Sequence, residues 1–72
     1  MKNQRTIIDA DVARISERYA CLKRISLDDS LKLVLNSKTY ITLTDIETGL
    51  CYEMTNYIYD MFLEEMEELN EL

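Results

Sequence analysis

The first third of the chain carries apolar residues at regular helical spacing, and this pattern limits the possible folds more than any other feature. Five apolar residues recur at steps of four, three, four and three positions: Ile8, Val12, Ile15, Tyr19 and Leu22. These steps place the five side chains along one stripe of an α-helix. The pattern therefore predicts an amphipathic helix from about residue 7 to Arg24.

A second helix start follows almost at once. Ser26 precedes Asp28 and Asp29, and a serine cap with acidic residues in the first turn favours the positive end of a helix. The apolar residues that follow lie on one face: Leu27, Leu31, Val34 and Leu35. We expect a second helix that packs at an angle against the first.

The middle segment, residues 39–54, admits two interpretations. Its threonines and Ile41 are residue types common in strands, and residues 45–49 could form the turn of a hairpin, which would make the fold α+β. Ser37 can instead cap a short helix, and a lone hairpin is only marginally stable. We favour the short helix and keep the hairpin at 39–54 as the alternative.

The last segment again has helical spacing. It begins at Thr55 and Asn56, and its apolar positions are Ile58, Met61, Phe62, Met66 and Leu69. The sequence thus predicts one all-α domain, residues 1–72, built as a small bundle of three longer helices and one short helix. Its expected core comprises Ile8, Val12, Ile15, Leu22, Leu31, Val34, Leu43, Ile58 and Phe62.

Composition excludes most kinds of chemistry. The chain has no His and a single Gly, so it can form neither a histidine general base nor a glycine-rich phosphate loop. Cys21 and Cys51 lie far apart without further zinc ligands. We expect no catalytic residue, no cofactor and no metal. The start of the chain resembles no secretory signal and no segment is long enough to span a bilayer, which predicts a cytoplasmic protein with reduced thiols and no membrane partner.

Charge is distributed unevenly along the chain. Residues 1–24 hold six bases and three acids (net +3), whereas residues 25–72 hold two bases and eleven acids (net −9). The overall charge of −6 opposes binding to nucleic acid. A helix-turn-helix would present Lys38 as the one base of its recognition helix. Nucleic acid is therefore an unlikely partner. The basic ridge of Arg14, Arg18 and Arg24 is expected to be a solvated face or a contact for carboxylates.

Residues 37–62 contain a recognisable string of motifs. Ser-Lys-Thr-Tyr at 37–40 is followed by Asp45, by Glu-Thr-Gly-Leu at 47–50 and by Tyr-Ile-Tyr at 57–59. This pattern resembles a family of short uncharacterised bacterial proteins, often encoded beside predicted toxins that include ADP-ribosyltransferase-like ones. The resemblance spans roughly residues 12–63 and implies an antitoxin-like binding protein. The chain departs from the family pattern before the last helix, where Thr55-Asn56 replaces Ser-Pro.

Three of the motif residues are expected to shape a turn. Gly49 is the only glycine, so the turn over 45–50 should place it at positive φ. Asp45 can accept hydrogen bonds from amides of its own loop, and Tyr40 can lock the turn from the preceding helix. We predict a structural role for these three residues.

The last helix and the residues before it carry the predicted partner surface. Tyrosine is enriched at interfaces, and the glutamates crowd the end of the chain, from Glu64 to Glu71. The candidate partner-binding residues are Tyr52, Tyr57, Tyr59, Leu63, Glu64, Glu65, Glu67 and Glu68. Our hypothesis is a non-enzymatic interaction module that occludes a toxin. The alternatives are a homo-oligomeric structural subunit that associates with itself and a small regulatory protein that binds DNA or acts in phage defence.

Overall fold

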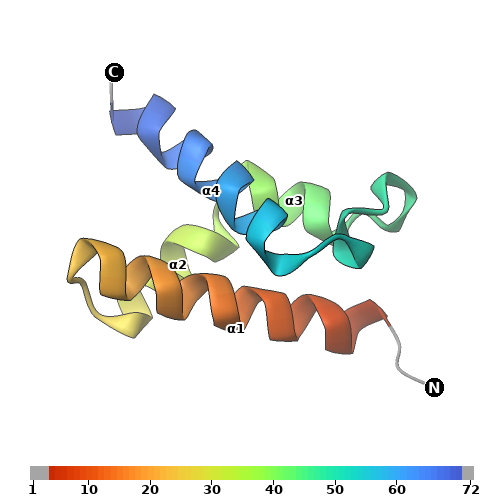
Figure 1. Ribbon diagram of the computed structural model, residues 1–72, viewed down its shortest axis with the longest axis horizontal. Helices are drawn as coiled ribbons and strands as arrows, with labels where there is room; N and C mark the ends of the chain where they lie inside the picture. The colour runs from red at the N-terminus through yellow and green to blue at the C-terminus, as the bar shows by residue number, and fades with distance from the viewer. Residues whose placement is uncertain (1–3, 71–72) are drawn as a thin grey trace.

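Over residues 4–70, four α-helices and two short 3-10 turns set the path of the chain. The computed structural model describes residues 4–70, and the side chains of residues 5–69. The elements are, in order, α1 (Gln4–Lys23), α2 (Leu27–Leu35), α3 (Lys38–Thr44), η1 (Ile46–Thr48), η2 (Leu50–Tyr52) and α4 (Thr55–Asn70). Figure 1 shows α4 rising away from α1 at an angle, with α2 packed between them along the C-terminal half of α1 and α3 beside α4.

The all-α prediction is confirmed for the described residues, and the short helix was the correct choice for the middle segment. Within residues 4–70 no strand is present, so the hairpin at 39–54 is wrong. Helix lengths differ from the expectation: α1 and α4 are long, at 20 and 16 residues, but α2 has only nine. The bundle thus has two long helices and two short ones.

The turn from α1 to α2 needs only three residues because α1 ends in a left-handed residue. Arg24 has φ 57°, and the Ile25 amide donates to the Ala20 carbonyl oxygen at 3.1 Å. This hydrogen bond is the six-to-one bond of a Schellman motif, in which the left-handed position usually belongs to glycine. The helix therefore stops at Lys23 rather than at the predicted Arg24.

α2 packs closely against α1 through two small residues. The Ser30 hydroxyl donates to the Ser16 carbonyl oxygen at 2.7 Å, and both serines are completely buried. At its start, α2 is capped as predicted, because the Ser26 hydroxyl accepts from the Asp29 amide at 3.0 Å. Small side chains let the two backbones approach, so the Ser30 side chain can reach the backbone of α1.

Ser37 links the end of α2 to the start of α3. Its hydroxyl donates to the Val34 carbonyl oxygen at 2.6 Å and accepts from the Tyr40 amide at 3.0 Å. The predicted helix cap at Ser37 is therefore confirmed. Because one buried side chain satisfies both helix ends, α2 and α3 are joined by only two residues.

One cluster of buried side chains holds the helices together. At its centre, Tyr19 and Phe62 meet edge to face, with ring centroids 5.0 Å apart. Seven of the nine expected core residues are buried: Ile8, Val12, Ile15, Val34, Leu43, Ile58 and Phe62. Leu31 is only partly buried. The cluster also includes Leu50 and Cys51 of η2. Both cysteines are free thiols: Cys51 is buried in this cluster, whereas Cys21 is exposed.

The prediction of a buried Leu22 is wrong. Leu22 follows Tyr19 on the apolar stripe of α1, yet its side chain is 57% exposed. α4 lies at an angle to α1, and the C-terminal ends of the two helices diverge (Figure 1). The stripe therefore extends one turn further than the part of α1 that α4 covers.

Candidate functional site

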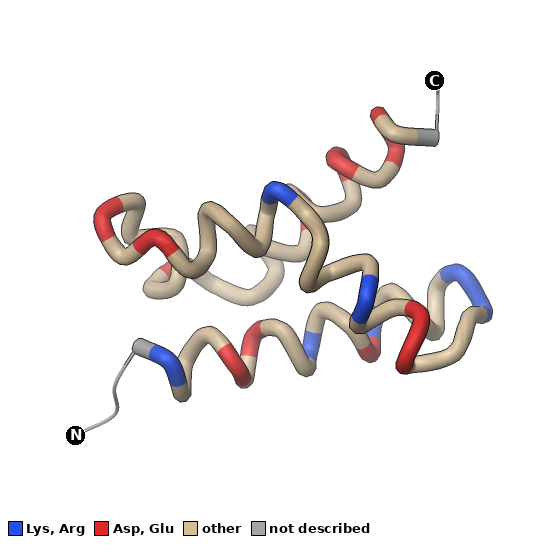
Figure 2. Tube along the Cα trace, turned by 180° about the vertical axis from the view of Figure 1, so that it is seen from behind, with Lys and Arg blue, Asp and Glu red and all other residues tan. Residues whose placement is uncertain are grey.

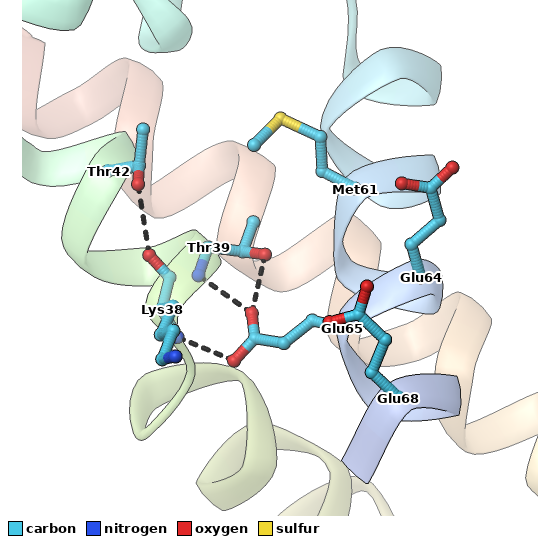
Figure 3. Close-up of a pocket in the computed structure, with 7 residues that line it drawn as sticks. All are labelled: Lys38, Thr39, Thr42, Met61, Glu64, Glu65 and Glu68. Carbon is cyan, nitrogen blue, oxygen red and sulfur yellow. Dashed lines mark hydrogen bonds between the residues drawn. The ribbon is translucent and has the colours of Figure 1, made fainter. Parts of the chain in front are cut away.

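The clearest polar constellation on the surface is a groove between α3 and α4, and Glu65 of α4 lies at its inner end. The Glu65 carboxylate accepts from the Lys38 amide at 2.7 Å and from the Thr39 amide at 2.9 Å. It also accepts from the Thr39 hydroxyl at 2.8 Å. Figure 3 shows these three bonds crossing from α4 to the first turn of α3.

Together, Glu65 and Ser37 satisfy the first amides of α3. A helix start leaves amide hydrogens without internal partners, and it carries partial positive charge. Glu65 takes the amides of Lys38 and Thr39, and Ser37 takes that of Tyr40. Glu65 therefore caps a helix that is remote in sequence, and it is not a freely exposed partner-binding residue as the sequence suggested.

The electrostatics of Glu65 reflect two opposed effects. Burial alone would raise the pKa of the Glu65 carboxyl group, because it disfavours the charged form. The hydrogen bonds from Lys38 and Thr39, with the positive charge of Lys38, outweigh burial and hold the pKa below its ordinary value of 4.5. The carboxylate is thus stabilised in its charged form.

The groove beside Glu65 has a volume of about 250 Å³ and is open to solvent. Its lining is formed by Lys38, Thr39, Thr42, Met61, Glu64, Glu65 and Glu68. In Figure 3 the Met61 side chain reaches from α4 toward α3, and Glu64 and Glu68 stand one turn apart on α4. Glu64 and Glu68 are exposed, unlike Glu65. The groove thus combines an apolar thioether with two solvent-facing carboxylates.

Tyr57 extends this surface along α4. Steps of four, three and four residues connect Tyr57, Met61, Glu64 and Glu68, which places them on one side of the helix. We call this set the α4 face. Tyr57 is 54% exposed, and Tyr52 and Met54 just before the helix are also exposed. Tyr57 and Tyr52 are therefore at the surface.

Tyr59 does not belong to this surface. The sequence suggests Tyr59 as a partner-binding residue, but its side chain is only 5% exposed. The Arg18 guanidinium lies 4.1 Å from the centre of the Tyr59 ring, and the same side chain donates to the Asn56 amide oxygen at 2.6 Å. Arg18 thus covers Tyr59 and ties α1 to α4, a role that sequence spacing does not show. Leu63 is partly buried against the core.

The rest of the acidic end is exposed where the structure describes it. Glu67 is exposed, like Glu64 and Glu68, and Glu71 lies outside the described residues. Figure 2 shows acidic positions repeated along the last turns of α4. Of the four predicted glutamates, three are therefore available to a partner.

The turn residues of the motif have structural positions. Gly49 has φ 71°, and the Asp45 carboxylate accepts from the Glu47 amide at 3.1 Å, both as predicted. The Thr48 hydroxyl lies 2.8 Å from the Asp45 carbonyl oxygen and 2.9 Å from that of Thr42. Tyr40 is partly buried against the core. The loop is thus tied to the end of α3.

Sequence reasoning missed a buried carboxylate, Asp11. It is only 4% exposed, and one oxygen accepts from the Thr55 hydroxyl at 2.8 Å. The other oxygen has no hydrogen-bonding partner within the described residues. Asp11 lies three residues after Ile8 and four before Ile15, so its place on the apolar stripe was the available signal. Its bond joins α1 to the start of α4.

Metal binding and membrane insertion depend on what the described side chains and helices offer. Among residues 4–70, no group of three or more His, Cys, Asp or Glu side chains could hold a metal ion. None of the helices in that range combines the length and the apolar character needed to cross a membrane.

Comparisons with known proteins give no further guidance. No protein-family model, no curated protein and no solved structure matches the chain.

Proposed function

We propose that this chain is a non-enzymatic interaction module of the cytoplasm that acts as an antitoxin, binding a toxin protein and occluding its active cleft. The observation that carries the proposal is the α4 face, where Glu64 and Glu68 are exposed beside Met61 at the open groove. The string of motifs over residues 37–59, which resembles proteins encoded beside toxins, supports the same function.

The partner surface would be basic. The Cβ atoms of residues four apart on a helix lie about 6 Å from each other. A lysine or arginine of the toxin could therefore pair with Glu64 and Glu68 while its methylene groups pack on Met61. The net charge of −6 would speed the encounter with a basic cleft. Occupying such a cleft would exclude the nucleotide or nucleic acid that a toxin uses.

The tyrosine at the other end of the α4 face would supply the apolar anchor. Tyr57 is 54% exposed, and an exposed tyrosine offers a large, rigid contact area with a polar tip. The carboxylates would then set orientation and association rate, and Tyr57 would contribute more to the lifetime of the complex.

The test is co-expression with the product of the gene adjacent to its own, with growth as the readout. Charge reversal at Glu64→Lys and Glu68→Lys should abolish protection from that product. The matched control is Glu17→Lys with Glu47→Lys, which changes the net charge equally at two exposed positions outside the groove. Loss of protection in both pairs, or in neither, would sink the proposed role of the α4 face.

A further inference from the structure

A second cavity lies beside α1 and is distinct from the groove between α3 and α4. It has a volume of about 150 Å³, and its described lining consists of Thr6, Ile7, Ala10, Asp11 and Arg14. Successive steps of one, three, one and three residues place these five on one side of the helix. Among the described residues, the cavity and the groove share no lining side chain. The cavity is therefore a separate feature of the surface.

Asp11 gives this cavity an unpaired acceptor. Its side chain is only 4% exposed, and the oxygen Oδ1 accepts from the Thr55 hydroxyl at 2.8 Å. The oxygen Oδ2 is buried without a hydrogen-bonding partner among the described residues. A buried acceptor that has lost its water and gained no donor is unfavourable, so native structures nearly always supply a partner. Because Asp11 belongs to the lining, the cavity is where such a partner can reach it.

Arg14 adds a positive charge one turn further along the same wall. It is exposed and lies three residues after Asp11, and the Cβ atoms of residues at this spacing are about 5–6 Å apart. Arg14 makes no hydrogen bond to Oδ2 of Asp11. A guanidinium group binds carboxylates through parallel hydrogen bonds. The cavity thus combines an acceptor for a cationic donor with a donor for an anion.

The size of the cavity and its apolar wall restrict what can fill it. Ile7 and Ala10 form this apolar wall. A buried water needs roughly two to four polar partners, and these two side chains offer none, whereas a small alkyl group can pack against them. A cavity of about 150 Å³ holds a molecule the size of benzene, which has about six non-hydrogen atoms. The best occupant is therefore a small molecule with a cationic, an anionic and an apolar group.

We infer that the cavity binds a small zwitterion, a free α-amino acid with a short apolar side chain such as alanine. The ammonium group of the ligand donates to Oδ2 of Asp11, its carboxylate accepts from the guanidinium of Arg14, and its methyl group packs on the apolar wall. Asp11 also holds the start of α4 through Thr55, so the ligand stabilises the junction of α1 and α4 (Figure 1). The site does not use the α4 face, and it is independent of the antitoxin proposal.

The first experiment titrates the ¹⁵N-labelled full chain with L-alanine and follows the backbone amide signals by NMR. Saturable shifts should centre on Asp11 and Arg14 and should extend to Thr55. Two fragments of the ligand test the need for both charges. Ethylamine, which lacks the carboxylate, and propionate, which lacks the ammonium group, should each bind at least about tenfold more weakly than L-alanine.

The second experiment removes each charge from the protein. Asp11→Asn keeps the shape of the side chain, and Arg14→Gln changes an exposed position. Each variant should raise the dissociation constant for L-alanine by about tenfold or more. Arg5→Gln is the matched control, because Arg5 is exposed and lies nine residues before Arg14, on the opposite side of α1. It should leave the dissociation constant within about twofold of wild type.

Three results would overturn the proposal. Titration without saturable shifts would leave the cavity to water. Ethylamine or propionate that binds as tightly as L-alanine would exclude a zwitterion as the ligand. An affinity for L-alanine that survives Arg14→Gln would do the same, and circular dichroism of this variant checks that its fold is intact. Because Arg14 is exposed, this last comparison holds even if Asp11→Asn unfolds the chain.

Discussion

Glu65 and Thr39 are 26 residues apart in sequence, yet the carboxylate of Glu65 accepts hydrogen bonds from both the amide and the hydroxyl of Thr39. This contact fixes the position of α3 relative to α4 and thereby forms the inner end of the groove. The candidate site thus depends on a structural contact made by one of its own glutamates.

Replacement of that glutamate should destabilise the whole fold. We expect Glu65→Ala to lower the free energy of unfolding by about 1–2 kcal/mol, because the first amides of α3 lose a charged acceptor. Urea denaturation followed by circular dichroism measures this change. Glu64→Ala, on an exposed neighbour, should stay within about 0.5 kcal/mol of wild type. Equal effects of the two variants would contradict the capping role.

The same contact predicts a pH dependence. The pKa of Glu65 in the folded chain lies below its ordinary value of 4.5, so its stabilising contribution is fully present above that pH. It is lost as the pH falls through the lower, folded value. The stability difference between wild type and Glu65→Gln should therefore be constant at higher pH and shrink in acid. A difference that stays constant down to about pH 3 would show that the carboxylate charge plays no part.

Arg18 should stabilise the junction of α1 and α4. Arg18→Ala removes the cation over the Tyr59 ring and the hydrogen bond to Asn56, so we expect a loss of about 1 kcal/mol in the free energy of unfolding. Arg18→Lys keeps the charge without the planar guanidinium, so its free energy of unfolding should lie between those of wild type and Arg18→Ala. Arg14→Ala, one turn earlier and exposed, serves as the control. Thermal unfolding that does not distinguish Arg18→Ala from Arg14→Ala would argue against this contact.

The two residues at positive φ, Arg24 and Gly49, predict opposite stability changes: introducing glycine at the first should stabilise the fold, and removing it at the second should destabilise the fold. Arg24→Gly should stabilise the chain by roughly 0.5–1 kcal/mol, because glycine adopts positive φ without steric cost. Gly49→Ala should destabilise it by about 1 kcal/mol through backbone strain alone, since no atom lies within 4 Å of an added Cβ. Lys23→Gly, one residue earlier and helical, should also destabilise. Chemical denaturation of the three variants compares these signs, and a destabilising Arg24→Gly would be inconsistent with the turn described.

Local signals explain what the sequence could predict. Ser26 and Ser37 cap helices by accepting from amides three residues away, and Gly49 adopts the positive φ that its own turn requires. Such features require only neighbouring residues, so they can be recognised in a chain whose fold is unknown. The cap at Ser37 is also the local signal that favours a helix over a hairpin in the middle segment.

The wrong predictions share a different cause. Burial of Tyr59, exposure of Leu22 and the capping contact of Glu65 all depend on how helices that are distant in sequence pack together. Periodicity identifies the apolar side of a helix, but it does not show where a partner helix stops covering that side. The end of α1 was placed one residue late because its left-handed position holds Arg24 instead of the usual glycine.

The central claim is that the α4 face binds a basic protein, and the most direct measurement is calorimetric titration of the purified chain with the product of the adjacent gene. We predict a stoichiometric complex that weakens at high salt and loses at least about tenfold in affinity with Glu64→Lys and Glu68→Lys, but not with Glu17→Lys and Glu47→Lys. No binding, or binding that both charge-reversed pairs retain in full, would contradict the claim.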